Sequence, residues 1–126
     1  MEQTMKEALI QLRRIYNALG EVEELSRQMA EALDRNDQVT VTMLLSMREE
    51  PVMTAHRARE TLGLMIDGSA AGQRLRAVLN GAEPENNEEK LLVNQAAMNE
   101  RLLKKVQELD RVLSGKIARD KSIYQN

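Results

Sequence analysis

The chain has 126 residues, no cysteine, no phenylalanine and no tryptophan, and its formal net charge is −2 with acidic and basic residues interspersed. This length fits one domain that can bury a core without disulfides. The lack of cysteine excludes disulfides, thiolate catalysis and Cys-ligated zinc. The small net charge gives no electrostatic case for binding nucleic acid or an anionic membrane surface.

Targeting and membrane signals are not found in the sequence. No stretch has the roughly 20 uninterrupted apolar residues that a membrane-spanning helix needs. Residues 1–14, MEQTMKEALIQLRR, carry charges throughout and do not form a secretory signal. We therefore expect a protein that stays in the cytoplasm and does not insert into a membrane.

The first predicted element is a long helix over residues 1–35. Its apolar residues follow alternating steps of three and four, the spacing of one helix face. They are Met5, Ala8, Leu12, Ile15, Leu19, Val22, Met29 and Leu33. Ser26 occupies one position at which this stripe predicts an apolar residue. A helix of this length is usual in a bundle or a coiled coil.

A second helix is predicted over residues 37–67, with Asp37 as its N-cap. Its opening, QVTVTM, alternates as a strand does, but no second strand signal exists for it to pair with. Pro51 lies inside this helix, although proline removes one helical hydrogen bond. The apolar spacing passes through Pro51 without a phase shift, which predicts one helix kinked there. Two helices meeting at Glu50 are the alternative.

The next predicted elements are a short helix over residues 69–80 and a long helix over residues 86–120. Gly68 suits a left-handed C-cap and Ser69 an N-cap. Asn86, followed by Glu89, has the spacing of a capping box that opens the last helix. After residue 120 the apolar rhythm fades, so we predict a tail over residues 121–126.

The last helix has the most regular pattern in the chain. Leu92, Asn99, Val106 and Leu113 recur every seven residues, and Leu102 and Leu109 fill the half-way positions. This period is typical of a helix packed against other helices. The sequence therefore predicts a single all-α domain over residues 1–126. We expect an elongated, coiled-coil-like antiparallel bundle of three long helices and one short helix.

Catalytic constellations are not found. His56 is the only histidine, and no strained-turn serine accompanies it. Met53 stands three residues before it, so the Glu-x-x-His pairs of a di-iron bundle are excluded. The glycines 68 and 72 lack the following lysine of a phosphate-binding loop, and arginines 57, 59, 74 and 76 have no aromatic residues beside them to stack bases. We predict no enzyme activity, no cofactor, no metal and no nucleic-acid partner.

What remains is surface for binding other helices. Long helices in an elongated three-helix arrangement can have more apolar face than they cover for one another, which leaves a groove for an amphipathic helix. The alternatives are a core closed within the chain, or a homodimer that uses the same stripe. Periodicity alone favours the closed core or the homodimer over an open groove.

Residues 91–113, LLVNQAAMNERLLKKVQELDRVL, followed by Tyr124, resemble the flagellar export chaperones of the FlgN type. In that family an Asn and paired leucines precede an apolar heptad helix, and a Tyr lies near the C-terminus. Asn99, Leu102, Leu103 and Tyr124 match these features. The sister FliT-type chaperones look similar at this level, so we suspect a type III secretion chaperone of the FlgN/FliT type.

The resemblance implies a cytoplasmic chaperone that binds amphipathic C-terminal helices of flagellar hook-associated (hook–filament junction) proteins. It would prevent their premature assembly and deliver them to the gate of the type III export apparatus, as a monomer or weak homodimer. The client-binding residues would be Met98, Leu102, Val106, Leu109 and Leu113, with Asn99 fixing the register. A self-associating coiled-coil scaffolding protein is the alternative function.

Overall fold

The computed structural model describes the backbone of residues 1–125 and the side-chain surroundings of residues 1–119. Residues 1–125 form four helices and no strand. The helices are α1 (Glu2–Asp34), α2 (Gln38–Met65), α3 (Ala70–Leu79) and α4 (Asn87–Gln125). The predicted all-α class is confirmed, and the alternating segment QVTVTM is helical.

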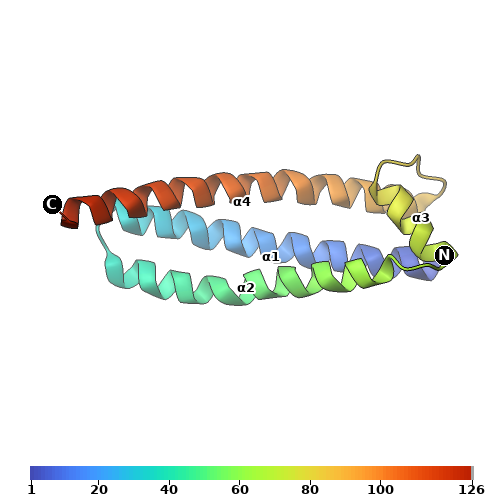
Figure 1. The fold of residues 1–126 in the computed structure, drawn as a ribbon, viewed down its shortest axis with the longest axis horizontal. Coiled ribbons are helices and arrows are strands. Elements are labelled where there is room, and N and C mark those ends of the chain that lie inside the picture. Colours follow the sequence, from blue (N-terminus) through green and yellow to red (C-terminus); the bar gives the residue numbers. More distant parts are fainter. Residues whose placement is uncertain (126) are drawn as a thin grey trace.

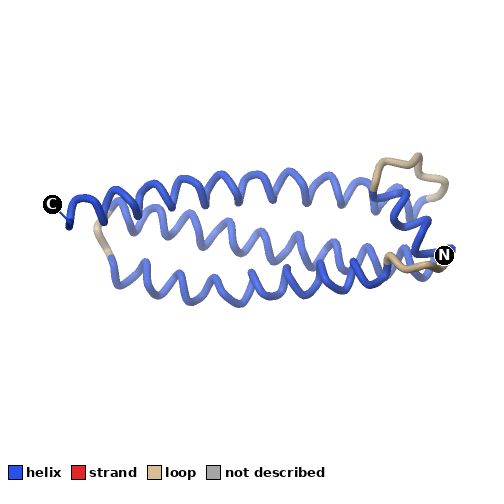
Figure 2. The backbone as a smooth tube through the Cα atoms, viewed as in Figure 1, coloured by secondary structure: helices blue, strands red, loops and turns tan. Residues whose placement is uncertain are grey.

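The three long helices lie side by side in an elongated layer with α1 between α2 and α4 (Figure 1). The chain runs along α1, returns along α2, crosses through α3 near its N-terminal end, and runs along α4 in the direction of α1. Only short connections join the helices (Figure 2). α1 packs along both neighbours, whereas the backbones of α2 and α4 hardly approach each other.

The burial pattern explains why α1 is central. Twelve of its residues are buried, against four in α2. These α1 residues contribute to three apolar clusters along the bundle, in each of which they meet α4. The deepest members from the other helices are Leu75, Val78 and Leu92 at one end, Ala58 and Val106 in the middle, and Val41, Leu44 and Leu113 at the other end. Because α1 has apolar residues on two faces, it can bind two helices at once.

The turn between α1 and α2 is built from local hydrogen bonds. Asn36 takes the left-handed conformation, with φ 57°, which asparagine tolerates at a helix end. The Asp37 side chain accepts a hydrogen bond from the backbone N–H of Thr40 at 3.1 Å, which confirms the predicted N-cap. The hydrogen bond from the Thr40 hydroxyl lowers the pKa of the Asp37 carboxyl below its ordinary value.

The turn between α2 and α3 differs in one respect from the prediction. Ser69 caps α3 as expected, since its hydroxyl accepts from the N–H of Gly72 at 3.0 Å. The left-handed C-cap at Gly68 is wrong, because among the described glycines only Gly81 has a positive φ. Asp67 organises this turn instead, with its carboxylate accepting from the N–H of Ser69 at 2.9 Å.

The predicted capping box of α4 is only half formed. Asn86 accepts from the N–H of Glu89 at 2.9 Å, as the spacing predicts. The Glu89 carboxylate, however, accepts from Nε of Arg74 at 3.1 Å, from Nη2 of Arg74 at 2.6 Å and from the N–H of Glu85 at 3.0 Å. Glu89 is buried, and its hydrogen bond with Arg74 lowers its pKa. This ion pair fastens α3 to α4.

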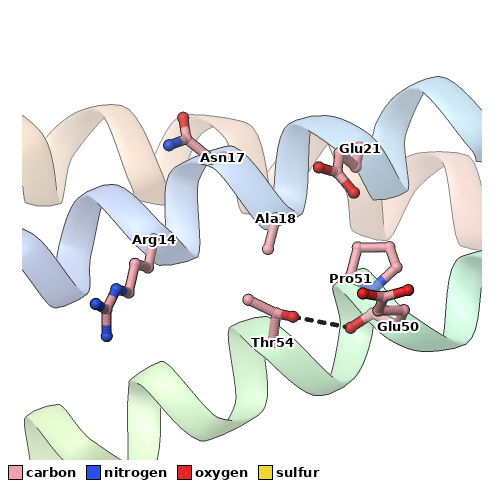
Figure 3. A pocket seen from close by; sticks show the side chains of 7 residues that line it. All are labelled: Arg14, Asn17, Ala18, Glu21, Glu50, Pro51 and Thr54. Atoms are coloured by element: carbon pink, nitrogen blue, oxygen red, sulfur yellow. Dashed lines mark hydrogen bonds between the residues drawn. The ribbon is translucent and has the colours of Figure 1, made fainter.

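Two further features differ from or refine the predicted boundaries. α2 is one helix with Pro51 inside it, and the buried proline ring points toward Ala18 and Glu21 of α1 (Figure 3). α4 continues through residues 121–125, which the fading rhythm assigns to a tail. Residues 118–125 contain no proline that would stop the helix. The side chain of Tyr124 and residue 126 lie outside the described part of the structure.

Candidate helix-binding groove

A groove runs between α2 and α4, with α1 as its floor. It exists because both helices pack on α1 but not on each other. Its cavity has a volume of about 210 Å³. The floor is formed by Leu12, Ile15 and Leu19, and the walls by Arg59 and Leu62 of α2 and Asn99, Glu100 and Leu103 of α4. An apolar floor between two helix walls is a form that accommodates apolar side chains of another helix.

The two rims of the groove carry opposite charges. Arg59 on α2 and Glu100 on α4 are both exposed. Glu100 pairs with Lys104 on its own helix at 3.4 Å, and Arg59 makes no ion pair with any residue whose side chain is described. A helix lying in the groove would therefore be favoured by an acidic side chain toward α2 and a basic one toward α4.

An ion pair crosses between α2 and α4 farther along the bundle. Nη2 of Arg48 lies 3.0 Å from Oδ1 of Asp110, and the Arg48 side chain is only 19% exposed. This pair joins the two walls where their backbones are too far apart to pack. It therefore limits the groove on the side of the α1–α2 turn.

Asn99 is the most specifically held of the predicted binding residues. It is 8% exposed, and its Nδ2 donates to the backbone carbonyl of Leu12 at 2.8 Å. Its Oδ1 accepts from Nε2 of Gln95 at 2.9 Å. Because the acceptor belongs to the α1 backbone, this bond sets the axial position of α4 against α1. Asn99 also lines the groove.

The structure separates the other five predicted residues. Val106 and Leu113 are buried in the middle and end clusters of the core. Leu102 is half-buried and packs against the middle cluster, while Met98 is 37% exposed. Leu109 lines a different hollow between α1 and α4, beside Glu23, Arg27, Lys104, Lys105 and Glu108. As a client-binding set these residues stay a prediction, and in this conformation they do not form one open surface.

The sequence pattern did not single out the α2 side of the groove. Arg59 and Leu62 come from a helix whose apolar residues are spread around its circumference, so periodicity could not say which side faces α4. Leu103 and Glu100 were visible only as flanks of the α4 seam. The available signal was Leu103, the second of the paired leucines.

Another hollow of the bundle has a polar rim. The hollow in Figure 3 lies between α1 and α2 and has about the volume of the groove, 210 Å³. Its lining residues are Ala18, Pro51, Arg14, Asn17, Glu21, Glu50 and Thr54. Thr54 donates to the carbonyl of Glu50 at 3.1 Å, a bond within α2. The polar side chains around this hollow are basic, acidic and neutral, and they do not form one set of ligand-binding groups.

The described residues also lack a metal cluster, since no three His, Asp or Glu side chains gather there. His56 is exposed, with Nε2 3.0 Å from Oε1 of Glu60 on the same helix. Within residues 1–125, none of the helices has both the length and the apolar character for crossing a membrane.

Comparisons with family models, curated proteins and solved structures give no significant match. The family resemblance therefore rests on the residues of α4 alone.

Proposed function

We propose that this protein is a cytoplasmic chaperone that binds an amphipathic client helix in the groove between α2 and α4. The observation that carries the proposal is the hollow between the two long helices, whose floor is made of the buried apolar side chains Leu12, Ile15 and Leu19 of α1. The resemblance of α4 to FlgN/FliT-type chaperones suggests the client. It would be the C-terminal helix of an unassembled hook-associated protein destined for the type III export apparatus.

A fourth helix would complete the arrangement that the three long helices begin. Helices pack with axes 8–10 Å apart when side chains of one enter gaps between side chains of the other. A client helix with apolar residues at positions i, i+3, i+4 and i+7 would set one row of them between Leu62 and Leu103. Burial of about 1,000 Å² is typical of weak, reversible complexes, which suits a client that must later be released.

The groove proposal is tested by capture from the source cell. The wild-type chain is expected to retain a hook-associated protein, and Leu103→Asp is expected to lose it because the charge enters the apolar groove. Leu91→Asp is the matched control, since Leu91 is 47% exposed on the same helix and does not line the groove. Circular dichroism of each variant checks that the helices remain folded.

Three outcomes decide the proposal. Loss of the client with Leu103→Asp alone supports the groove. Loss with Leu102→Asp plus Leu109→Asp, but not with Leu103→Asp, would place the client on the other flank of α4 and refute the groove. Failure of the wild-type chain to retain any flagellar or secreted helical protein would refute the chaperone function itself.

A further inference from the structure

A furrow runs along the line where α1 and α2 meet, and it shares no lining residue with the groove. It consists of the hollow in Figure 3 and a second hollow of about 290 Å³ beside it. The two hollows share the lining residues Arg14 and Thr54. The buried residues of the furrow are the small side chains Ala18, Pro51 and Ala58. Every charged residue that lines it is exposed.

The charges along the furrow are separated by sign. Arg14 and Arg57 line one of the two hollows, and Glu21 and Glu50 line the other. Figure 3 shows Arg14 at one end and the two glutamates at the other, with Ala18 between them. Seven residues separate the arginine from the glutamate on each helix, which is about 10 Å along the helix axis. Like charges therefore face each other across the furrow, and none of the four makes an ion pair with another side chain that the structure describes.

Each of these charges belongs to a row of exposed residues that recur every seven positions, two turns apart on nearly one face of the helix. Each row is complementary to its own reverse. Reversal of the row on α1 sets Arg14 against Glu21, and reversal of the row on α2 sets Arg57 against Glu50. The row on α1 is Glu7, Arg14, Glu21 and Gln28, and the row on α2 is Met43, Glu50, Arg57 and Leu64.

We infer that a second copy of this chain packs face to face on the furrow, with α1 on α1 and α2 on α2, each pair antiparallel. The two-fold axis crosses α1 between residues 17 and 18, and it crosses α2 between residues 53 and 54. At each end the two arginines of one copy then lie level with the two glutamates of the other. The same residue in the two copies, such as Glu50, is about 10 Å apart along the helix axis.

The charge pattern identifies a second copy as the occupant. A single rotation brings all four charges of each copy level with opposite charges, as the self-complementary surface of a two-fold dimer requires. In the same register, Met43 lies level with Leu64 of the second copy. These side chains are 54% and 81% exposed, so each would cover an apolar surface that is open in one chain.

The charges also select this orientation over the other face-to-face arrangement. If the two-fold axis ran along the helices, α1 would lie on α2 of the second copy. Arg14 would then be level with Arg57, and Glu21 with Glu50, so that like charges would meet at both ends. Like charges in contact are unfavourable.

The dimer is expected to be weak, since ion pairs between exposed side chains each contribute little. It is also expected to weaken further as salt screens the charges. The contact leaves the groove between α2 and α4 accessible, because no residue that lines the furrow also lines the groove. The inference is therefore independent of the proposed function.

Exchange of the charges tests the dimer by sedimentation at low salt. The wild-type chain is expected to show a concentration-dependent monomer–dimer equilibrium. Arg14→Glu plus Arg57→Glu makes the furrow wholly acidic, and Glu21→Arg plus Glu50→Arg makes it wholly basic. Each double variant alone should dimerise at least tenfold more weakly than the wild type, because like charges would meet. An equal mixture of the two variants should restore dimers, since acidic and basic furrows fit each other.

The matched control changes two charges outside the furrow. Arg13→Glu plus Arg101→Glu alters exposed arginines that do not line it, and this variant should dimerise as the wild type does. A wild-type chain that stays monomeric at millimolar concentration would overturn the inference. So would a mixture of the acidic and basic variants that associates no more tightly than either alone, or a control variant that loses the dimer as they do.

Cysteine cross-linking tests the orientation, since the native chain has no cysteine. Asn17→Cys lies next to the two-fold axis, where the two α1 helices cross-link if their Cα atoms come within about 5.5 Å. Gln28→Cys is the control, because it is also exposed on α1 but its two copies would lie about 31 Å apart. Asn17→Cys should therefore form a disulfide-linked dimer and Gln28→Cys should not. No dimer with Asn17→Cys, or equal cross-linking at both positions, would refute this arrangement.

Discussion

The buried amide of Asn99 offers a quantitative test of how α4 is held against α1. Replacing Asn99 by Asp keeps the size of the side chain but exchanges the Nδ2 donor for a carboxylate oxygen. That oxygen would face the carbonyl of Leu12, at a site where Nδ2 now lies 2.8 Å away. Both groups would then be acceptors, and the site is only 8% exposed.

The expected cost follows from these contacts. Asn99→Ala loses one neutral hydrogen bond and should lower the free energy of unfolding by about 1 kcal/mol. Asn99→Asp also buries a negative charge beside the Leu12 carbonyl oxygen, and it should lower the free energy of unfolding by about 3 kcal/mol at neutral pH. Asn99→Leu should lie within about 1 kcal/mol of the wild type, because the Leu12 carbonyl keeps its bond within α1 and the leucine gains apolar burial.

Urea unfolding followed by circular dichroism measures these differences, with the slope of the transition as a check on two-state behaviour. Burial raises the pKa of the introduced Asp carboxyl, so its penalty should be full at high pH. The penalty should shrink as the pH falls and the protonated carboxyl donates to Leu12. An Asn99→Asp variant that matches Asn99→Ala at neutral pH, with a pH-independent difference from the wild type, would refute the contact.

Two other predictions concern the end of the bundle near α3. Because Arg74 lowers the pKa of Glu89, the pair stabilises the fold at neutral pH, and this stabilisation is lost as the pH falls through the lowered pKa. The thermal unfolding midpoint of Glu89→Gln should therefore lie on the order of 5 °C below that of the wild type at neutral pH. A difference between the two midpoints that persists unchanged in strong acid would contradict the ion pair. Gly72→Ala should lower the free energy of unfolding, since an added Cβ would lie 2.7 Å from the backbone nitrogen of Asp67. Gly20 has open space around it, so Gly20→Ala should raise the free energy of unfolding by about 0.5–1 kcal/mol in the same urea assay. Equal effects at the two glycines would show that the α2–α3 turn is not tightly packed.

The parts of the fold that local signals control could be predicted from the sequence. The apolar stripes of α1 and α4 have a strong helical period, and Asp37 and Ser69 cap helices at the predicted places. These features depend on residues within a turn or two of one another. The same reasoning correctly makes QVTVTM helical, because no other strand exists to pair with it.

The features that depend on distant residues could not be predicted. The acceptor of the Asn99 amide lies 87 positions away in the chain, and the partner of Glu89 lies on another helix. The distance between α2 and α4 depends on how each packs on α1, which no local pattern encodes. The seam residues of α4 were therefore predicted as one binding surface, whereas the structure buries Val106 and Leu113 and opens the groove beside Leu103.

Titration of the isotope-labelled chain with a synthetic C-terminal helix of a hook-associated protein, followed by nuclear magnetic resonance, locates the bound helix. The groove proposal predicts saturable shifts centred on Leu62, Leu103 and Arg59, with little change at Leu64, an exposed residue of α2 that does not line the groove. Shifts confined to exposed residues of α2 such as Val39 and Leu64 would contradict it. So would the absence of saturable shifts at peptide concentrations of about 1 mM, where even a weak complex of this size would form.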